Sequence, residues 1–202
     1  MGFVDKKNLL EDLGADVVME LGCGPNKKHA NAIGIDALDY EGVDIVGDAL
    51  EIIKAFPEKS VSAVYTYHFL EHVDDVPVFL EEIARLLRPG GTLNVVVPHF
   101  SNPYYYSDVT HKKFFGLYTM CYFSQGGGLR RKVPTYQREL SYRLTAVKLV
   151  FKSSPPFYVR HGLKKLFEKL VNISAYTKEL YEEMFCYMVP CYEIYYQLRR
   201  ID

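Results

Sequence analysis

Short apolar runs alternate with helical or turn-rich stretches in the first hundred residues. Each run is rich in β-branched residues and is bounded by Gly, Pro or Asp, which predicts buried strands joined by crossovers. The predicted strands in this region are Asp16–Leu21, Ala32–Asp36, Asp44–Gly47, Ser62–Tyr67 and Thr92–Val97. Strands alternating with crossovers in this way favour the α/β class, with a mostly parallel sheet.

The clearest crossover helix lies between the last two of these strands. Its apolar positions recur at helical spacing from Phe79 to Leu87, Pro77 suits a first helical turn, and Pro89-Gly90-Gly91 ends the pattern. By contrast, only ten residues separate Leu21 from Ala32. The first crossover therefore has room for no more than a turn or two of helix.

The second half of the chain has a different character. Residues 98–128 are rich in Tyr, Phe, Gly and Ser and are long for a connection, so we expect a lid or substrate loop there. The pattern then predicts a strand at Leu140–Phe151, a helix at His161–Tyr187 and a final strand at Cys191–Leu198. We expect one domain over residues 1–202, with a basic helical insertion at about 155–187 before the last strand.

Composition is that of a soluble globular protein. The 202 residues are 49% hydrophobic and 24% charged, and no apolar run approaches the roughly 18 residues of a membrane span. We therefore expect a cytoplasmic protein without a transmembrane segment. The four cysteines form no C-x-x-C pair, so we expect buried thiols and no metal site.

Charge is distributed unevenly along the chain. Residues 1–90 hold 17 acidic and 8 basic residues, whereas residues 129–169 hold 11 Lys or Arg against Glu139 and Glu168. A basic stretch of this kind favours an anionic partner, which would be a phosphorylated or nucleotide-linked substrate, a nucleic acid or an acidic membrane surface. A merely solvated basic face is the alternative.

A basic amphipathic helix is predicted within this stretch. Its apolar positions are Leu163, Leu166, Phe167, Leu170, Val171 and Ile173, and its charged positions are Lys164, Lys165, Glu168 and Lys169. We expect the apolar face to pack on the sheet. Peripheral contact with an anionic membrane is the alternative.

A glycine-rich turn follows the first predicted strand. The strand ends at Leu21 and runs into Gly22-Cys23-Gly24, where missing side chains let a ligand approach main-chain N–H groups. The second strand ends in Asp36 and the third is followed by Asp48. Because parallel strands open onto one crevice at their carboxyl ends, one adenosine could contact all three segments.

Two features disfavour a dinucleotide in this crevice. The third glycine of G-x-G-x-x-G is missing, and Asp36 lies only 14 residues after Gly22 rather than about 20. An adenosyl ligand without phosphates needs only the close turn and the acidic partner. A nicotinamide oxidoreductase is therefore a weaker alternative.

The chain resembles the class I S-adenosylmethionine-dependent methyltransferases, particularly the small type-11-like group. The resemblance rests on Glu20–Pro25, the two acidic strand ends, Val64–Val73 and Leu86–Leu93. It implies a Rossmann-like sheet of seven strands with helices on both faces and an antiparallel C-terminal edge. It also implies S-adenosyl-L-methionine as the cofactor and S-adenosyl-L-homocysteine as its product.

The resemblance further implies roles for individual residues. Glu20, Gly22 and Gly24 would shape the methionine and ribose side of the cofactor site, and Asp36 would bind the ribose. The remaining implied residues are Asp48 and Ala49 beside adenine, and Tyr67 and His68 on the floor.

Transfer to an oxygen nucleophile calls for a base, because the hydroxyl must lose its proton. The candidates are His99, directly after the fifth strand, and Asp108 with His111 in the Tyr-rich loop. Imidazole titrates near neutral pH, and a carboxylate can orient it. For His99 and His111, a structural hydrogen bond is the alternative role, and we expect a structural role for His72.

We expect a small-molecule or glycan-like acceptor that is methylated on a hydroxyl oxygen. The loop segments around His99 and His111 resemble those of methyltransferases that modify such molecules. Two alternatives stay open: a non-catalytic module that binds an adenosyl ligand or a partner, and an RNA methyltransferase. The string Asn102–Tyr105 resembles a nucleic-acid methyltransferase box, but it follows the wrong strand.

Overall fold

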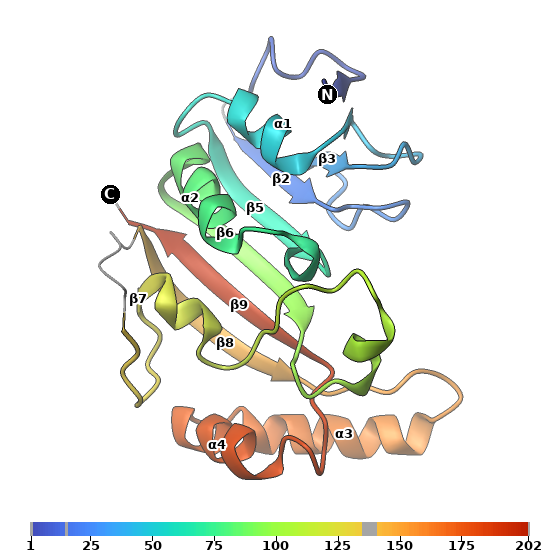
Figure 1. Cartoon of the computed structure of the whole chain (residues 1–202), viewed down its shortest axis with the longest axis vertical. Coiled ribbons are helices and arrows are strands. Elements are labelled where there is room, and N and C mark those ends of the chain that lie inside the picture. The colour runs from blue at the N-terminus through green and yellow to red at the C-terminus, as the bar shows by residue number, and fades with distance from the viewer. Residues whose placement is uncertain (1, 15, 135–140, 202) are drawn as a thin grey trace.

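The computed structural model describes residues 2–14, 16–134 and 141–201. Its described strands form a single nine-stranded sheet in the order β1-β4-β3-β2-β5-β6-β9-β8-β7 (Figure 1). The strands are β1 (Val4–Asp5), β2 (Val17–Leu21), β3 (Ile33–Asp36), β4 (Ile45–Val46), β5 (Val61–Tyr67), β6 (Leu87–Pro98), β7 (Ser124–Gly126), β8 (Tyr142–Val150) and β9 (Glu193–Arg200).

The α/β class and the mostly parallel sheet are confirmed. Strands β2 to β6 are parallel to one another, and β9 lies antiparallel between β6 and β8. The sheet has nine strands instead of seven because two short strands, β1 and β7, extend its edges. Position 140, where we predicted β8 to begin, lies outside the described residues.

Helices α1 (Ala49–Ala55) and α2 (Val76–Leu86) lie side by side over one face of the sheet (Figure 1). Asp48 and Asp75 begin them by accepting hydrogen bonds from the main-chain N–H groups of Glu51 and Val78. Their buried side chains join the core together with the apolar residues of the strands. Burial of this apolar surface is the main stabilising contribution to the fold.

No helix forms in residues 22–32 or 37–44, which follow β2 and β3. The prediction of at most a short helix after β2 agrees with this result. The side chains of Tyr65, Tyr67 and Tyr195 on the neighbouring strands are half-buried. A crossover helix would pack on apolar side chains. In this part of the sheet, tyrosines with polar hydroxyl groups occupy those positions instead.

The predicted helix at His161–Tyr187 is divided into shorter pieces. These are α3 (Tyr158–Val171), α4 (Ala175–Leu180) and a π-helical turn η4 (Tyr181–Phe185). The break falls at Ser174, whose hydroxyl accepts from Thr177 N–H in a capping box and so starts α4. The 3₁₀ turns elsewhere are η1 (Leu70–His72), η2 (Pro103–Ser107) and η3 (Thr119–Tyr122).

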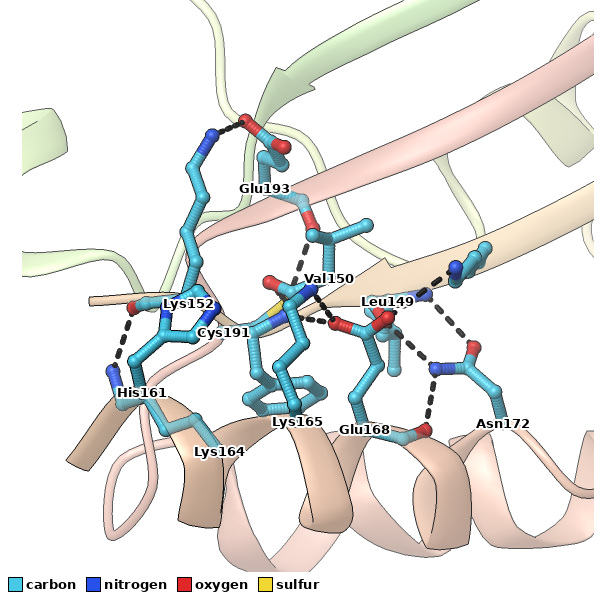
Figure 2. Close-up of polar contacts among 12 residues, drawn as sticks. Leu149, Val150, Lys152, His161, Lys164, Lys165, Glu168, Asn172, Cys191 and Glu193 are labelled. Atoms are coloured by element: carbon cyan, nitrogen blue, oxygen red, sulfur yellow. Dashed lines mark hydrogen bonds and ion pairs between the residues drawn. The ribbon is translucent and has the colours of Figure 1, made fainter. Parts of the chain in front are cut away.

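Helix α3 runs along the edge of β8 and turns polar side chains toward it (Figure 2). The Asn172 amide accepts from Leu149 N–H at 2.9 Å and donates to Leu149 C=O at 2.7 Å. Glu168 accepts from Phe151 N–H at 2.8 Å. These side chains satisfy the strand groups that no neighbouring strand reaches.

The predicted packing of the apolar face of α3 is therefore wrong for most of its residues. Leu163, Leu166, Leu170 and Ile173 are between 54% and 70% exposed, whereas Glu168 is buried. A helix that packs against a strand edge meets main-chain N–H and C=O groups, so its inner positions must be polar. Only Phe167 and Val171 of the predicted apolar face pack toward the core.

Glu168 is buried with its charge compensated. Lys165 Nζ lies 2.7 Å and Lys148 Nζ lies 3.3 Å from its carboxylate oxygens. Burial alone would raise the pKa of Glu168, but its hydrogen bonds with Lys165, Phe151 N–H and Lys148 lower it below the usual value.

Two further predictions can be compared with the described residues. All four cysteines are free and buried, as expected. None of the described helices is both long and apolar enough to cross a membrane.

The edge contact predicts how two substitutions in and beside α3 differ. Asn172→Ala leaves the buried main-chain groups of Leu149 without partners and should lower the free energy of unfolding by about 1–3 kcal/mol. Leu170→Ala, on the outward face, should change it by less than about 0.5 kcal/mol. Urea denaturation measures both values. A larger loss for Leu170→Ala would mean that α3 packs through its leucines.

Candidate functional site

A cavity of about 380 Å³ lies where β2, β3, β4 and β5 end. This volume falls within the roughly 300–1,000 Å³ of small-molecule sites. Four of the predicted site residues line it together: Gly22, Asp36, Asp48 and Ala49. Its apolar lining comes from Ile35, Leu50, Phe69, Val73 and Phe79.

Gly22 lets two strand ends approach each other closely. Its N–H donates to Ile35 C=O at 2.8 Å, and its φ of +66° is a left-handed conformation that favours glycine. A Cβ atom at this position would lie 2.6 Å from Cδ2 of Phe69. The absence of a side chain therefore allows the Phe69 ring to form one wall of the cavity.

Asp36 is oriented by two main-chain N–H groups. Its Oδ2 accepts from Gly24 N–H at 2.8 Å, and its Oδ1 accepts from Leu38 N–H at 3.0 Å. The second contact folds the chain back after β3, and the first ties β3 to the glycine turn after β2. The structure thus fixes a carboxylate at the wall of the cavity.

Glu20 and Gly24 support the cavity without lining it. The Glu20 carboxylate is buried and accepts from the N–H groups of Lys28 and His29 at 2.8–3.0 Å. This anchors the loop that follows the glycine turn. Their predicted role in shaping the ligand site stays a prediction.

Tyr67 and His68 are not among the cavity-lining residues. The Tyr67 hydroxyl lies 2.9 Å from His29 Nε2, and Lys28 Nζ lies 3.5 Å from the centre of its ring. His68 has a φ of +53°, and its Nε2 lies 3.0 Å from Glu193 Oε2. Their assignment to the floor of the cofactor site also stays a prediction.

His68 and Glu193 stabilise each other's charged form. Burial alone would lower the pKa of His68, but Glu193 and Glu71 raise it to about 9. Burial alone would raise the pKa of Glu193, but His68 and Lys152 lower it to about 2. At neutral pH the imidazolium and the carboxylate therefore form an ion pair between β5 and β9.

The three predicted catalytic residues lie in two different places. His99 is fully buried, with Nδ1 2.8 Å from Ser101 Oγ and Nε2 3.0 Å from Glu182 Oε2. His111 lies elsewhere, 3.6 Å from Asp108 Oδ2 and next to His72. His72 lines the cavity, so this second group reaches the site and His99 does not. The catalytic roles of all three stay predictions.

Several cavity residues were not predicted from the sequence. Phe69, His72, Val73, Asp74 and Asp75 all follow β5. From the sequence we predicted site residues in this segment only as far as His68, and we expected a structural role for His72. The rule that ligands bind beyond the carboxyl ends of parallel strands would have extended the search into this segment.

A second, basic cavity of about 280 Å³ lies at the start of α3. Its lining includes Lys152, Arg160 and Lys164, together with Asn102 and Tyr104 from the Tyr-rich loop. Lys152 also binds Glu193 Oε2 at 2.8 Å. A chain of contacts through Glu193 and His68 therefore connects this cavity with the end of β5.

Comparison with known proteins identifies the fold. A family model described as a methyltransferase domain matches residues 19–95. No curated protein matches the sequence.

Three solved structures of methyltransferases are similar to the chain. One is an S-adenosylmethionine-dependent methyltransferase from Archaeoglobus fulgidus, with a TM-score of 0.56 and 18% identity over 96% of this chain and 92% of that chain. Another is a protein from Bacillus halodurans that is assigned as a methyltransferase without an established activity. Its TM-score is 0.57 at 14% identity, over 98% of this chain and 99% of that chain.

The third is phosphoethanolamine N-methyltransferase 2 from Haemonchus contortus, solved with S-adenosylhomocysteine. Its TM-score is 0.51 at 11% identity, over 96% of this chain and 51% of that chain. Together the comparisons show that residues 19–95 match the methyltransferase-domain family and that the fold is that of the S-adenosylmethionine-dependent methyltransferases.

The packing of Gly22 against Phe69 predicts a difference between the two glycines of the turn. Gly22→Ala should lower the free energy of unfolding by about 2–4 kcal/mol, because a left-handed alanine is strained and its Cβ overlaps Phe69. Gly24→Ala is the matched control. Its φ is +56°, but no atom of the described residues outside its immediate chain neighbours lies within 4 Å of the added Cβ, so the loss should be about 1–2 kcal/mol. Equal losses in denaturant titrations would contradict the close contact.

Proposed function

We propose that this chain binds S-adenosyl-L-methionine in the 380 Å³ cavity and transfers its methyl group to a hydroxyl oxygen of a small-molecule or saccharide acceptor. The observation that carries the proposal is the meeting of Gly22, Asp36 and Asp48, from three different strand ends, around one cavity. A class I methyltransferase fold supports the reaction type.

The chemistry of the cavity fits the cofactor. Asp36 offers a carboxylate of the kind that accepts hydrogen bonds from ribose hydroxyls. Leu50, Val73 and Phe79 offer an apolar lining for a flat base, with Asp48 and Ala49 beside it. No cluster of Lys or Arg lines the cavity within the described residues, which agrees with a ligand without phosphates.

The chain's part in the reaction is positioning. The cofactor, when bound, supplies a sulfonium methyl group that is already a strong electrophile. Asp36 and the glycine turn orient the nucleoside end, and Phe69 and Phe79, whose ring centres lie 5.4 Å apart, exclude water from the cavity wall. We propose that the acceptor hydroxyl gives its proton to the pair of His111 and Asp108, which lies next to the cavity residue His72.

The basic cavity supports an acceptor that carries an anionic group. Lys152, Arg160 and Lys164 line it, and the Lys152–Glu193–His68 contacts lead from it toward the end of β5. An acceptor spanning this path would place its anion among the lysines and its hydroxyl toward the cofactor cavity.

Asp36 provides the first test. Asp36→Ala should raise the dissociation constant of S-adenosyl-L-methionine at least about fivefold, because two hydrogen bonds to a charged acceptor are lost. Isothermal titration calorimetry measures this, with the exposed Asp12→Ala as the control that keeps wild-type affinity. Equal affinity for the Asp36 variant would contradict the assignment of the cavity.

Turnover separates the enzyme from a non-catalytic module. The full chain is incubated with methyl-labelled cofactor and pools of small hydroxylated metabolites, saccharides and RNA, and the products are searched for mass shifts. Labelled small molecules and S-adenosylhomocysteine support the proposal. Cofactor binding without transfer to any pool favours the binding module, and labelled RNA with steeply salt-dependent affinity favours an RNA methyltransferase.

A second proposal is peripheral contact with an anionic membrane, and the outward leucines of α3 favour it. Phe157, Tyr158 and Val159 extend the exposed apolar row, and Arg160 and Lys169 add exposed positive charge. Apolar residues flanked by basic ones are typical of helices that lie in a membrane interface. The basic cavity opens at the start of the same helix, where it could receive the headgroup of a lipid-linked acceptor.

Vesicle flotation tests the membrane contact. The full chain should float with vesicles containing phosphatidylglycerol and stay in solution with phosphatidylcholine alone. Replacing Leu166 and Leu170 with Ser should lower the bound fraction about tenfold, because two exposed apolar side chains that the membrane would bury are replaced by polar ones. The wild type staying in solution with acidic vesicles, or equal flotation of the variant, would overturn the proposal.

A further inference from the structure

A buried carboxylate without a hydrogen-bond donor lies beside the cofactor cavity. Glu71 is fully buried, and neither Oε1 nor Oε2 has a hydrogen-bond partner among the residues that the structure describes. A buried carboxylate is costly unless cations or hydrogen-bond donors compensate its charge. The imidazolium of His68, whose Nδ1 lies 3.5 Å from Oε1, supplies part of this compensation, and Oε2 has no hydrogen-bond partner among the described residues.

Two histidines approach the same carboxylate. Ligand atoms of Glu71, His72 and His111 all lie within 4.8 Å of one another, and His111 Nε2 is 4.0 Å from Glu71 Oε1. The two imidazole rings meet edge to face, with their centres 4.9 Å apart. The arrangement brings two nitrogen donors and one oxygen donor around one point.

Hydrogen bonds at Nδ1 of each ring leave Nε2 as the lone-pair nitrogen. His111 Nδ1 donates to Tyr105 C=O at 2.9 Å. His72 Nδ1 lies 2.9 Å from Thr110 Oγ1, which itself donates to Asp108 Oδ1 at 2.6 Å, so the hydroxyl accepts from the imidazole. Histidines that bind metals are characteristically fixed by such contacts on the other ring nitrogen.

The fold holds these residues together although 39 positions separate His72 from His111 in the chain. The N–H groups of Lys112 and Lys113 both donate to Glu71 C=O, at 2.7 and 3.3 Å. These bonds dock the Tyr-rich loop onto η1 and bring His111 over Glu71. The donor set is thus preorganised by main-chain contacts.

We propose that Glu71, His72 and His111 bind one divalent transition-metal ion. Two imidazole nitrogens and one carboxylate oxygen are the donors of catalytic zinc sites and of non-haem iron sites, and they are a poor match for Mg²⁺ or Ca²⁺. Two ligand atoms about 2.1 Å from one ion lie about 3.0–3.4 Å apart. The three ligand atoms, which now lie within 4.8 Å of one another, would therefore each move by about one ångström to bind it.

His72 connects the metal site to the cavity that it lines. An ion with an open coordination position is a Lewis acid that binds a hydroxyl oxygen and lowers its pKa. This role in methyl transfer rests on the proposed function, whereas metal binding itself does not. Metal binding and cofactor binding are therefore measured in separate experiments.

The test uses the untagged full chain, stripped with a chelator and then given Zn²⁺ or Co²⁺ without any methyl donor. We expect about one ion per chain by elemental mass spectrometry after desalting, and visible absorption bands of Co²⁺ bound to nitrogen and oxygen ligands. His111→Gln should weaken binding at least tenfold and remove the bands. Thr110→Val should weaken binding about tenfold, because His72 loses its supporting hydroxyl.

Control variants keep the result interpretable. His161→Gln replaces a histidine that binds Ser153 in another part of the fold, and it should bind the ion like the wild type. Circular dichroism and thermal melting establish that each variant is folded. Less than one tenth of an ion per wild-type chain, or unchanged binding by both His111→Gln and Glu71→Gln, would overturn the proposal. Calorimetry of the chelator-treated chain with S-adenosyl-L-methionine reports separately on the cofactor cavity.

Discussion

The contact between Gly22 and the ring of Phe69 is the constraint on which the 380 Å³ cavity depends. It joins the segment after β2 to the segment after β5, and it is possible only because residue 22 has no side chain and adopts a left-handed conformation. With Phe69 in place, the chain continues through η1 to His72, which also lines the cavity. The cavity and the histidine cluster therefore depend on one close approach.

Polar side chains that bind main-chain groups organise the rest of the site. Glu20 holds the loop after the glycine turn, Asp36 holds the turn itself, and Asp48 begins α1. Each carboxylate accepts from N–H groups that the neighbouring segments leave unpaired. The same principle operates at the far edge of the sheet, where Glu168 of α3 and Asn172 directly after it bind main-chain groups at the end of β8.

The sequence predicts those features that depend on local pattern and on the geometry of parallel strands. The strands from Val17 to Val97, helix α2 and the meeting of Gly22, Asp36 and Asp48 follow from periodicity and from the rule for strand ends. The orientation of α3 could not be predicted in this way, because periodicity identifies an apolar face without showing which neighbour it meets. The edge of β8 selects polar contacts and turns Leu163, Leu166 and Leu170 outward.

The cluster of Glu71, His72 and His111 depends on tertiary docking. The sequence placed His111 with Asp108 in a loop and His72 in a structural role, and it indicated no metal site. The docking of Lys112 and Lys113 onto Glu71 C=O is a long-range main-chain contact without a local signature. Because such contacts leave no pattern in the sequence, single candidate residues can be identified from it, but the clusters in which the fold brings them together cannot.

An experimental structure of the chain with S-adenosylhomocysteine tests the account most directly. The account predicts the nucleoside between Asp36 and Asp48, with its methionine end beside Gly22 and Phe69. A ligand bound elsewhere on the sheet, or Asp36 without any contact to the bound nucleoside, would contradict it.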